Sequence, residues 1–139
     1  MPKKVPAYLL DTNIVLDLIG KREPFVNNAV RIFALAEKEQ VTLWVSPHSL
    51  ATIYYFLSKS KGRKSASMLL EKLLNLLHVA PIDETVVRRA FTYGFRDWED
   101  ALVASAAQSA RLDGVITRNV KDFKPSPLPV LLPEEVLAR

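Results

Sequence analysis

Three aspartates stand where their carboxylates could act together on a phosphate group. Asp11 directly follows the apolar run Ala7–Leu10, and Asp97 and Asp100 open a later segment rich in alanine. Because Asp97 and Asp100 are three residues apart, they share one face of a helix. Clustered carboxylates repel one another, and a divalent cation removes that cost, lowers the pKa of bound water and offsets the charge of a phosphodiester. These residues predict a divalent-metal site that acts on phosphodiester bonds.

The amino-acid composition limits which metal such a site could hold. The chain of 139 residues has no cysteine and only two histidines, His48 and His78, which excludes thiolate and multi-histidine zinc sites. Oxygen ligands select hard ions, so Mg²⁺ or Mn²⁺ is the expected cofactor. The formal net charge of +4 suits an anionic partner such as nucleic acid.

The segments that must position these acids alternate between strands and helices. Short buried runs predict strands at residues 7–10, 41–45 and 114–117, and shorter ones at 79–82 and 130–132. Helical spacing of apolar residues predicts helices between them, from residues 12, 25, 47, 66, 84, 97 and 133 onward. We therefore expect an α/β fold, a three-layer α/β/α arrangement with a central parallel sheet of four to five short strands.

Length and hydropathy favour one domain over residues 1–139, with Pro47–His78 as an inserted helical hairpin. About half of the chain (49%) is hydrophobic, which is enough for a core. No apolar run reaches the length of a membrane span, and residues 1–6 lack the apolar segment of a secretory signal. We therefore expect a cytoplasmic protein without a membrane partner.

The positions of the acids relative to the sheet follow from where parallel sheets bind ligands. Ligands lie beyond the carboxyl ends of the strands. Asp11 follows one strand end, and Thr117 and Asn119 mark another. Counting elements places the turn of Asp97 and Asp100 at the other edge of the sheet, so we expect the inserted helices to fold over the strand ends and bring that turn to Asp11.

Each acid also has a purely structural interpretation. Asp97 is a good helix N-cap, and Asp100 stands at the third position of a capping box, a role compatible with an outward-facing carboxylate. Asp11 could cap the helix that follows it. Asp17 is expected on the solvated face of its helix, and Asp122 could cap a turn.

Basic residues suggest where phosphates could bind. Lys59, Lys61 and Arg63 cluster with Lys64 in the turn between the two inserted helices. Near the site they would contact RNA phosphates and make binding salt-dependent, and otherwise they form a solvated turn. Arg118, next to Asn119, is the better candidate for a phosphate contact, with ion pairing to a local acid as the alternative.

Three segments occur in order along the chain: LLDTNIVLD at residues 9–17, DWEDAL at 97–102 and ITRNVKDF at 116–123. Together they resemble the opening, third acidic and closing motifs of the PIN domain, the fold of VapC-type toxins in bacterial toxin–antitoxin pairs. With the order of the strands, the resemblance covers nearly the whole chain. It implies a PIN-type endoribonuclease dependent on Mg²⁺ or Mn²⁺, often a homodimer, whose partner is a small antitoxin.

The resemblance also assigns roles to single residues. Asp11 would be the first metal ligand, Asp100 the central acid of the third motif, and Asp97 a further ligand or an outer carboxylate. Asn119 stands where many members have a fourth aspartate, and Asp122 would be its substitute. The residues lining the site would be Asn13, Thr52, Thr117, Asn119 and Asp122.

One departure from the family pattern concerns the second acid. Most members carry a glutamate in the helix after the second strand, and Thr52 stands about where that acid is expected. Fewer carboxylates mean weaker metal affinity, so the alternative function is a catalytically degenerate PIN domain that binds RNA or a protein. A second alternative, a phosphatase with Asp11 as nucleophile, lacks the second acid that such sites carry two positions on, because residue 13 is Asn13.

Overall fold

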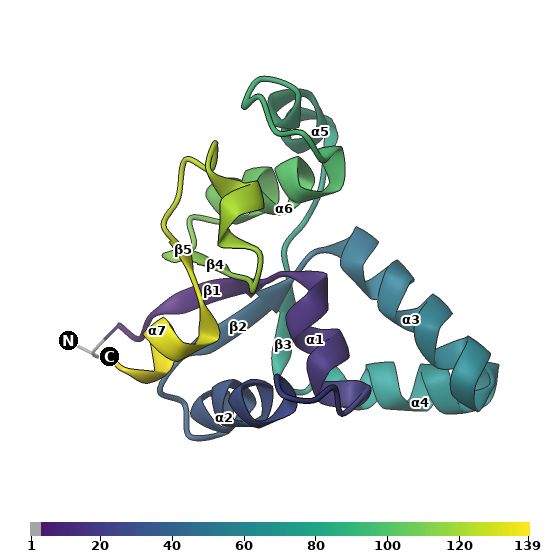
Figure 1. The fold of residues 1–139 in the computed structure, drawn as a ribbon. Helices are drawn as coiled ribbons and strands as arrows, with labels where there is room; N and C mark the ends of the chain where they lie inside the picture. Colours follow the sequence, from purple (N-terminus) through teal and green to yellow (C-terminus); the bar gives the residue numbers. More distant parts are fainter. Residues whose placement is uncertain (1–3) are drawn as a thin grey trace.

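Five parallel strands form the central sheet of the structure, a computed structural model that describes residues 4–139 (Figure 1). Their order across the sheet is β3-β2-β1-β4-β5, and every neighbouring pair is parallel. The strands are short: β1 Ala7–Leu10, β2 Thr42–Val45, β3 Leu77–Val79, β4 Gly114–Ile116 and β5 Val130–Leu131. The expected parallel sheet is thus confirmed, with β1 at its centre.

Helices cover both faces of this sheet and complete three layers. Leu10 and Ile116 face the larger core with α1, α2 and α7, whereas their neighbours Leu9 and Val115 face the smaller core with α5 and α6. This alternation is the two-residue period of a strand buried on both faces. The helices are α1 Thr12–Ile19, α2 Val26–Glu37, α3 Pro47–Lys61, α4 Arg63–Leu73, α5 Glu84–Ala90, α6 Trp98–Ser109 and α7 Pro133–Leu137, with the 3-10 turn η1 Val120–Phe123.

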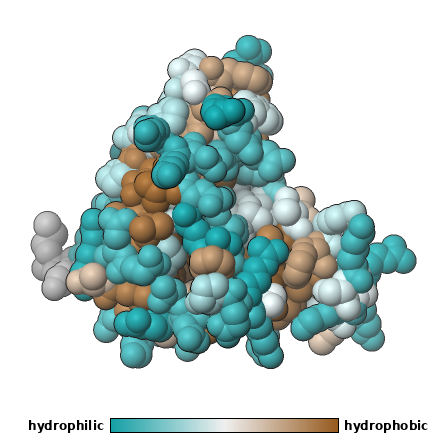
Figure 2. Space-filling view, in the orientation of Figure 1, coloured by the Kyte–Doolittle hydropathy of each residue, from teal (hydrophilic) through white to brown (hydrophobic). Residues whose placement is uncertain are grey.

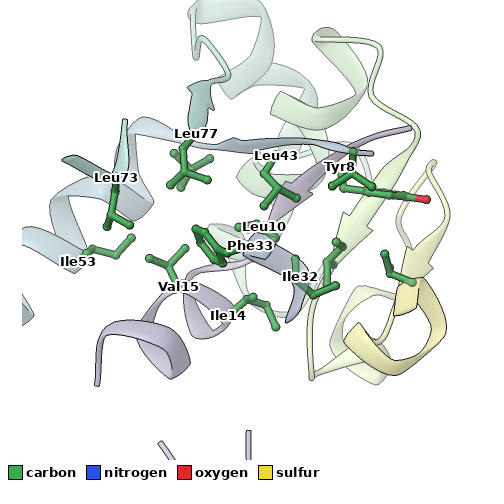
Figure 3. Packing of buried hydrophobic residues seen from close by; sticks show 14 of the residues in the cluster. Tyr8, Leu10, Ile14, Val15, Ile32, Phe33, Leu43, Ile53, Leu73 and Leu77 are labelled. Carbon is green, nitrogen blue, oxygen red and sulfur yellow. The ribbon is translucent and has the colours of Figure 1, made fainter. Parts of the chain in front are cut away.

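The larger core fixes α1 and α2 beneath the sheet. Figure 3 shows Val15 of α1 and Phe33 of α2 directed toward Leu10 and Leu43 of the strands. Leu10, Val15 and Leu43 have no exposed surface. The start of α1, and with it Asp11, is therefore held against the end of β1 by close packing.

The inserted segment forms two packed helices that project from the sheet (Figure 1). Ile53 and Leu57 of α3 belong to the same buried cluster as Leu73 of α4. The helical part is shorter than the expected Pro47–His78, because residues 77 and 78 pair with β2 and begin β3. Leu77 continues the leucine spacing of α4, so spacing alone could not separate it from the helix.

The position of α6 differs from the sequence expectation. Because β4 lies directly beside β1, the helix that leads into β4 packs on these two strands and begins at the carboxyl edge of the sheet, next to the end of β1. The inserted helices are not needed to bring this turn to Asp11. Among residues 4–139, no helix is long and apolar enough to cross a membrane.

A buried ion pair ties α1 to the segment after β4. Asp17 is only 1% exposed and accepts hydrogen bonds from Nε of Arg118 at 2.6 Å and from Nη2 at 3.1 Å. The guanidinium also lies 3.8 Å from the ring centroid of Phe25. The expectation that Asp17 faces solvent is therefore wrong, because its partner comes from a distant part of the chain. This pair holds the segment 117–119 in place beside α1.

We expect Asp17→Ala to lower the free energy of unfolding by about 3 kcal/mol, because it leaves a largely buried guanidinium without its counter-ion. Urea unfolding followed by circular dichroism measures the change. The matched control is Glu84→Ala, which breaks the i,i+4 pair with Arg88 whose side chains are both 77% exposed, and which should cost less than about 1 kcal/mol. Equal losses in the two variants would show that burial adds nothing to the Asp17–Arg118 pair.

Candidate functional site

An open cavity of about 240 Å³ lies at the carboxyl edge of the sheet, where the first turns of α1, α3 and α6 meet. In Figure 2 the surface is hollowed between the upper lobe, formed by α5 and α6, and the arm formed by α3 and α4. We call this hollow the acidic cavity, and it is lined by Asp11, Thr12, Asn13, Leu16, His48, Thr52, Glu99, Asp100, Val103 and Asn119.

Asp11 is the most firmly held carboxylate of the acidic cavity. It is 7% exposed, and its Oδ2 accepts hydrogen bonds from the Thr117 hydroxyl at 2.8 Å and the Asn13 side-chain amide at 3.2 Å. Its Oδ1 accepts from the Thr12 backbone N–H at 2.8 Å, so Asp11 also caps α1. Burial raises the pKa of Asp11, and the bonds from Thr117 and Thr12 oppose that rise. Thr117 in turn accepts a hydrogen bond from the Asn119 backbone N–H at 3.0 Å.

Asp100 faces the same cavity from the first turn of α6. Burial, followed by the charge of Asp11 and then of Asp97, raises the pKa of Asp100 to about 7. Like charges raise a carboxyl pKa only when they lie close by in a poorly solvated place. Asp11 and Asp100, which come from distant parts of the sequence, therefore form a repelling pair that a bound cation would relieve.

Asp97 is close enough for its charge to raise the pKa of both Asp11 and Asp100, but it is bonded differently from them. Its Oδ1 caps α6 by accepting hydrogen bonds from the backbone N–H groups of Glu99 at 2.8 Å and Asp100 at 3.4 Å. Its side chain lines a neighbouring groove and not the acidic cavity. Within residues 4–139, no three acidic or histidine side chains are close enough together to hold one metal ion.

The donor set nevertheless fits a hard divalent ion. Mg²⁺ is usually bound by one or two carboxylates, with water and substrate phosphate completing its shell, and Asp11 and Asp100 supply two. The amide oxygen of Asn13 is a further donor, because this buried atom has no hydrogen-bond partner in the described part of the chain. With oxygen donors predominating and no cysteine in the chain, the cavity suits Mg²⁺ or Mn²⁺.

Two ionisable residues of the cavity were not singled out from the sequence. Glu99 adds an exposed carboxylate beside Asp100. His48 lines the opposite wall, where burial lowers its pKa against the opposing influence of Glu99 and Asp11, and its Nδ1 has no partner in the described residues. Its position four residues before Thr52 puts both on one face of α3, a spacing that could have identified it.

The remaining predicted residues divide between the cavity and its surroundings. Thr52 and Asn119 line the cavity, and Thr117 holds Asp11 from beneath. Asp122 lines the groove beside Asp97. The guanidinium of Arg118 is used by Asp17 instead of facing the cavity.

The basic turn lies at the opposite end of α3 from the cavity. Lys59 and Lys61 lie in the last turn of α3, and Arg63 begins α4. Thr52, the residue of the cavity nearest to that end of α3, is separated from Lys61 by about 14 Å along the helix, at 1.5 Å per residue. Figure 1 shows this end of the α3–α4 pair pointing away from the sheet.

Comparison with known proteins agrees with this architecture. Residues 7–121 match a family model described as the PIN domain. The chain is 27% identical over 137 residues to ribonuclease VapC1 of Aquifex aeolicus, which covers 94% of this chain and 92% of that protein. Among solved structures, it is similar to a chain of VapBC2 from Rickettsia felis bound to a DNA fragment from their promoter, with 25% identity, a TM-score of 0.69 and coverage of 91% and 98%. A toxin–antitoxin complex from Klebsiella pneumoniae contains a chain with 26% identity, a TM-score of 0.69 and coverage of 91% and 97%.

The crowding of carboxylates predicts how stability depends on pH. The pKa of Asp100 is about 7 in the folded chain against an ordinary value of 3.8, so the folded state binds more protons between these values. Stability of the metal-free protein therefore falls as pH rises through this window. Asp100→Asn removes this penalty, so its melting temperature in EDTA should exceed that of the wild type at about pH 8, and the difference should vanish near about pH 4.

Differential scanning calorimetry at several pH values measures this difference. Glu71→Gln, on the exposed surface of α4, is the control and should change the melting temperature little at any pH. A melting temperature of Asp100→Asn below that of the wild type at the higher pH would contradict the repelling pair.

Proposed function

Because the chain belongs to the PIN domain family, as the match over residues 7–121 shows, we propose that it is a ribonuclease that hydrolyses phosphodiester bonds of RNA with Mg²⁺ or Mn²⁺. The observation that carries the proposal is the meeting of Asp11 and Asp100 in one cavity at the carboxyl edge of the sheet. The similarity to a protein named a ribonuclease supports the choice of substrate.

The residues of the cavity divide the work of such a reaction. Thr117 and the backbone of Thr12 fix the Asp11 carboxylate, so its oxygens keep one orientation. Asp11 and Asp100 would hold the metal ion, with the Asn13 amide beside them. When bound, the ion supplies an activated water and neutralises charge on the phosphate.

We also propose that the chain is the toxin of a toxin–antitoxin pair, acts as a homodimer and is inhibited by a small antitoxin. The similar chains from Rickettsia felis and Klebsiella pneumoniae belong to a VapBC structure and a toxin–antitoxin complex. Both are covered almost completely by this chain, which supports a comparable partner.

A second candidate function is a PIN domain that binds RNA or protein without catalysis. Thr52 supplies no carboxylate to the cavity, and residues 4–139 contain no group of three possible ligands among acidic and histidine side chains. An assay of RNA cleavage separates the two candidates, because only a nuclease shows turnover that depends on Asp11 and on a metal ion.

We expect RNA cleavage that requires Mg²⁺ or Mn²⁺ and stops in EDTA. Asp11→Asn and Asp100→Asn should each lower the rate by about 100-fold or more, because each removes charge that stabilises the reacting phosphate. Cleavage of a labelled RNA at saturating metal measures the rates. Glu84→Gln, which changes an exposed carboxylate outside the cavity lining, is the control and should retain full activity.

The outcomes assign the function. Metal-dependent cleavage abolished by Asp11→Asn excludes the non-catalytic candidate, whereas RNA that stays intact at high Mn²⁺ removes the nuclease proposal.

Arrest of cell growth on expression of the wild type, but not of Asp11→Asn, is expected of a toxin. Light scattering should give twice the mass of one chain for a homodimer.

Restoring the missing acid provides a separate test of the site. Thr52 lines the cavity from α3, so Thr52→Glu should add a carboxylate there and strengthen Mn²⁺ binding by about tenfold. Isothermal titration with Mn²⁺ measures the affinity. Ala51→Glu, an exposed neighbour outside the cavity lining, is the control. Equal effects of the two substitutions would show that Thr52 is not at the metal.

A further inference from the structure

A second, larger hollow lies beside the acidic cavity, and it is lined by cationic side chains. Arg96, Lys121 and Lys124 form its walls, and we call this hollow of about 520 Å³ the basic groove. The other lining residues are Gly94, Asp97, Asp122 and Pro125. Its three cations face two carboxylates, so the groove has an excess of positive charge.

The cations of the basic groove are available to an external anion. Within residues 4–139, the structure contains only two ion pairs, Arg88–Glu84 and Arg118–Asp17, and neither involves the groove. The Asp97 carboxylate is used to cap α6. Because all three cationic side chains are exposed and unpaired in this part of the chain, binding an anion there breaks no internal pair.

The basic groove and the acidic cavity are formed on the same two chain segments. Asp97 in the groove accepts a hydrogen bond from the backbone N–H of Asp100, which lines the cavity. On the other wall, the N–H of Asp122 donates to the carbonyl of Asn119, which also lines the cavity, at 3.0 Å. Each wall of the groove is therefore one helical turn from a wall of the cavity, a separation comparable to neighbouring phosphates of one strand.

An exposed aromatic pair is close in sequence to the groove, since Trp98 directly follows Asp97. The rings of Phe91 and Trp98 are stacked with centroids 5.1 Å apart, although they are 69% and 40% exposed. They flank the segment that contains Gly94 and Arg96. Exposed aromatic faces beside a positive groove are the combination that binds single-stranded nucleic acid, in which bases are free to stack.

We propose that the basic groove binds the phosphates of single-stranded RNA next to the scissile one, and that the Phe91–Trp98 pair stacks an unpaired base of that strand. This inference rests on the proposed ribonuclease function and specifies its substrate as an unpaired segment. It replaces the turn of Lys59, Lys61 and Arg63 as the place where phosphates adjoining the cavity bind.

The test measures binding of a labelled single-stranded RNA of about 12 nucleotides by fluorescence anisotropy at several KCl concentrations. All variants carry Asp11→Asn so that the RNA stays intact. Neutralising the groove should make the negative slope of log K, the association constant, against log[salt] less steep by about 2, or about 0.7 per cation. It should also weaken binding by about 100-fold at about 0.1 M salt. The groove variant combines Arg96→Gln, Lys121→Gln and Lys124→Gln.

Two variants with the same loss of charge are the controls. One removes exposed cations of α2, its C-cap and α4 that lie outside the groove, by Arg31→Gln, Lys38→Gln and Lys72→Gln. The other neutralises Lys59, Lys61 and Arg63. Both should bind within about twofold of the parent at the same salt. If either loses as much affinity as the groove variant, net charge or the hairpin end accounts for binding and the inference is overturned.

The aromatic pair is tested with the same RNA and with its duplex form. Trp98→Ala should weaken binding of the single strand by about tenfold, in line with the loss of one stacked base, and leave duplex binding unchanged. Tyr55→Ala, which removes a 59% exposed ring from α3, is the matched control and should have no effect. Binding should also quench tryptophan fluorescence in the parent but not in Trp98→Ala.

Failure of this inference and failure of the nuclease proposal give different results. If the protein with Asp11 intact does not cleave RNA but the groove variant still loses RNA binding, the groove is an RNA-binding site without catalysis. If the protein cleaves RNA and the groove substitutions change neither binding nor kcat/KM, the groove is overturned, and an acidic protein partner becomes its candidate ligand.

Discussion

The burial of the Asp11 carboxylate at the junction of β1 and β4 is the constraint on which the site depends. A buried carboxylate needs hydrogen bonds in place of water, and here they come from Thr117 and from the first turn of α1. The backbone hydrogen bonds between β1 and β4 continue as far as Asp11, because the backbone N–H of Asp11 donates to the carbonyl of Ile116. A shift of the strands by one residue would turn Asp11 toward the opposite face of the sheet. The register that builds the two cores therefore also positions the carboxylate.

The arginine that follows β4 is kept out of the acidic cavity. Arg118 precedes Asn119, which lines the cavity, but its guanidinium is neutralised by Asp17 of α1. If Arg118 faced the cavity, it would pair with Asp11 or Asp100 and compete with a metal ion for the same oxygens. Three unpaired cations lie instead in the basic groove. In the proposed function, one strand of RNA would meet both a metal ion in the acidic cavity and the cations of this groove.

The sequence predicted those features that depend on short-range pattern. An apolar run that stops at Asp11 identified the end of β1. The alternation of predicted strands with predicted helices identified the α/β class. Other features depend on contacts that local pattern cannot show. Asp17 looked solvated because its partner Arg118 is 101 positions away. The start of α6 was placed at the wrong edge because it follows from the adjacency of β1 and β4, which no local spacing encodes. Asp97 could be a cap, a ligand or both, and its hydrogen bonds to the start of α6 establish the cap.

The small number of carboxylates gives the proposed site a particular dependence on its substrate. Asp11 and Asp100 are its two partly or fully buried carboxylates, Glu99 is exposed to solvent, and Thr52 stands in place of a further acid, so few carboxylates are held in the interior of the cavity. A phosphate brought in by RNA would complete the shell of a hard ion, as substrates commonly do for Mg²⁺. Binding of metal and of RNA are then thermodynamically linked, each strengthening the other by the same factor. In the proposed complex, cations that hold the neighbouring phosphates would increase the fraction of the protein that is bound to RNA. They would thereby raise the apparent affinity for the metal at a given RNA concentration, which would offset part of the charge missing at Thr52.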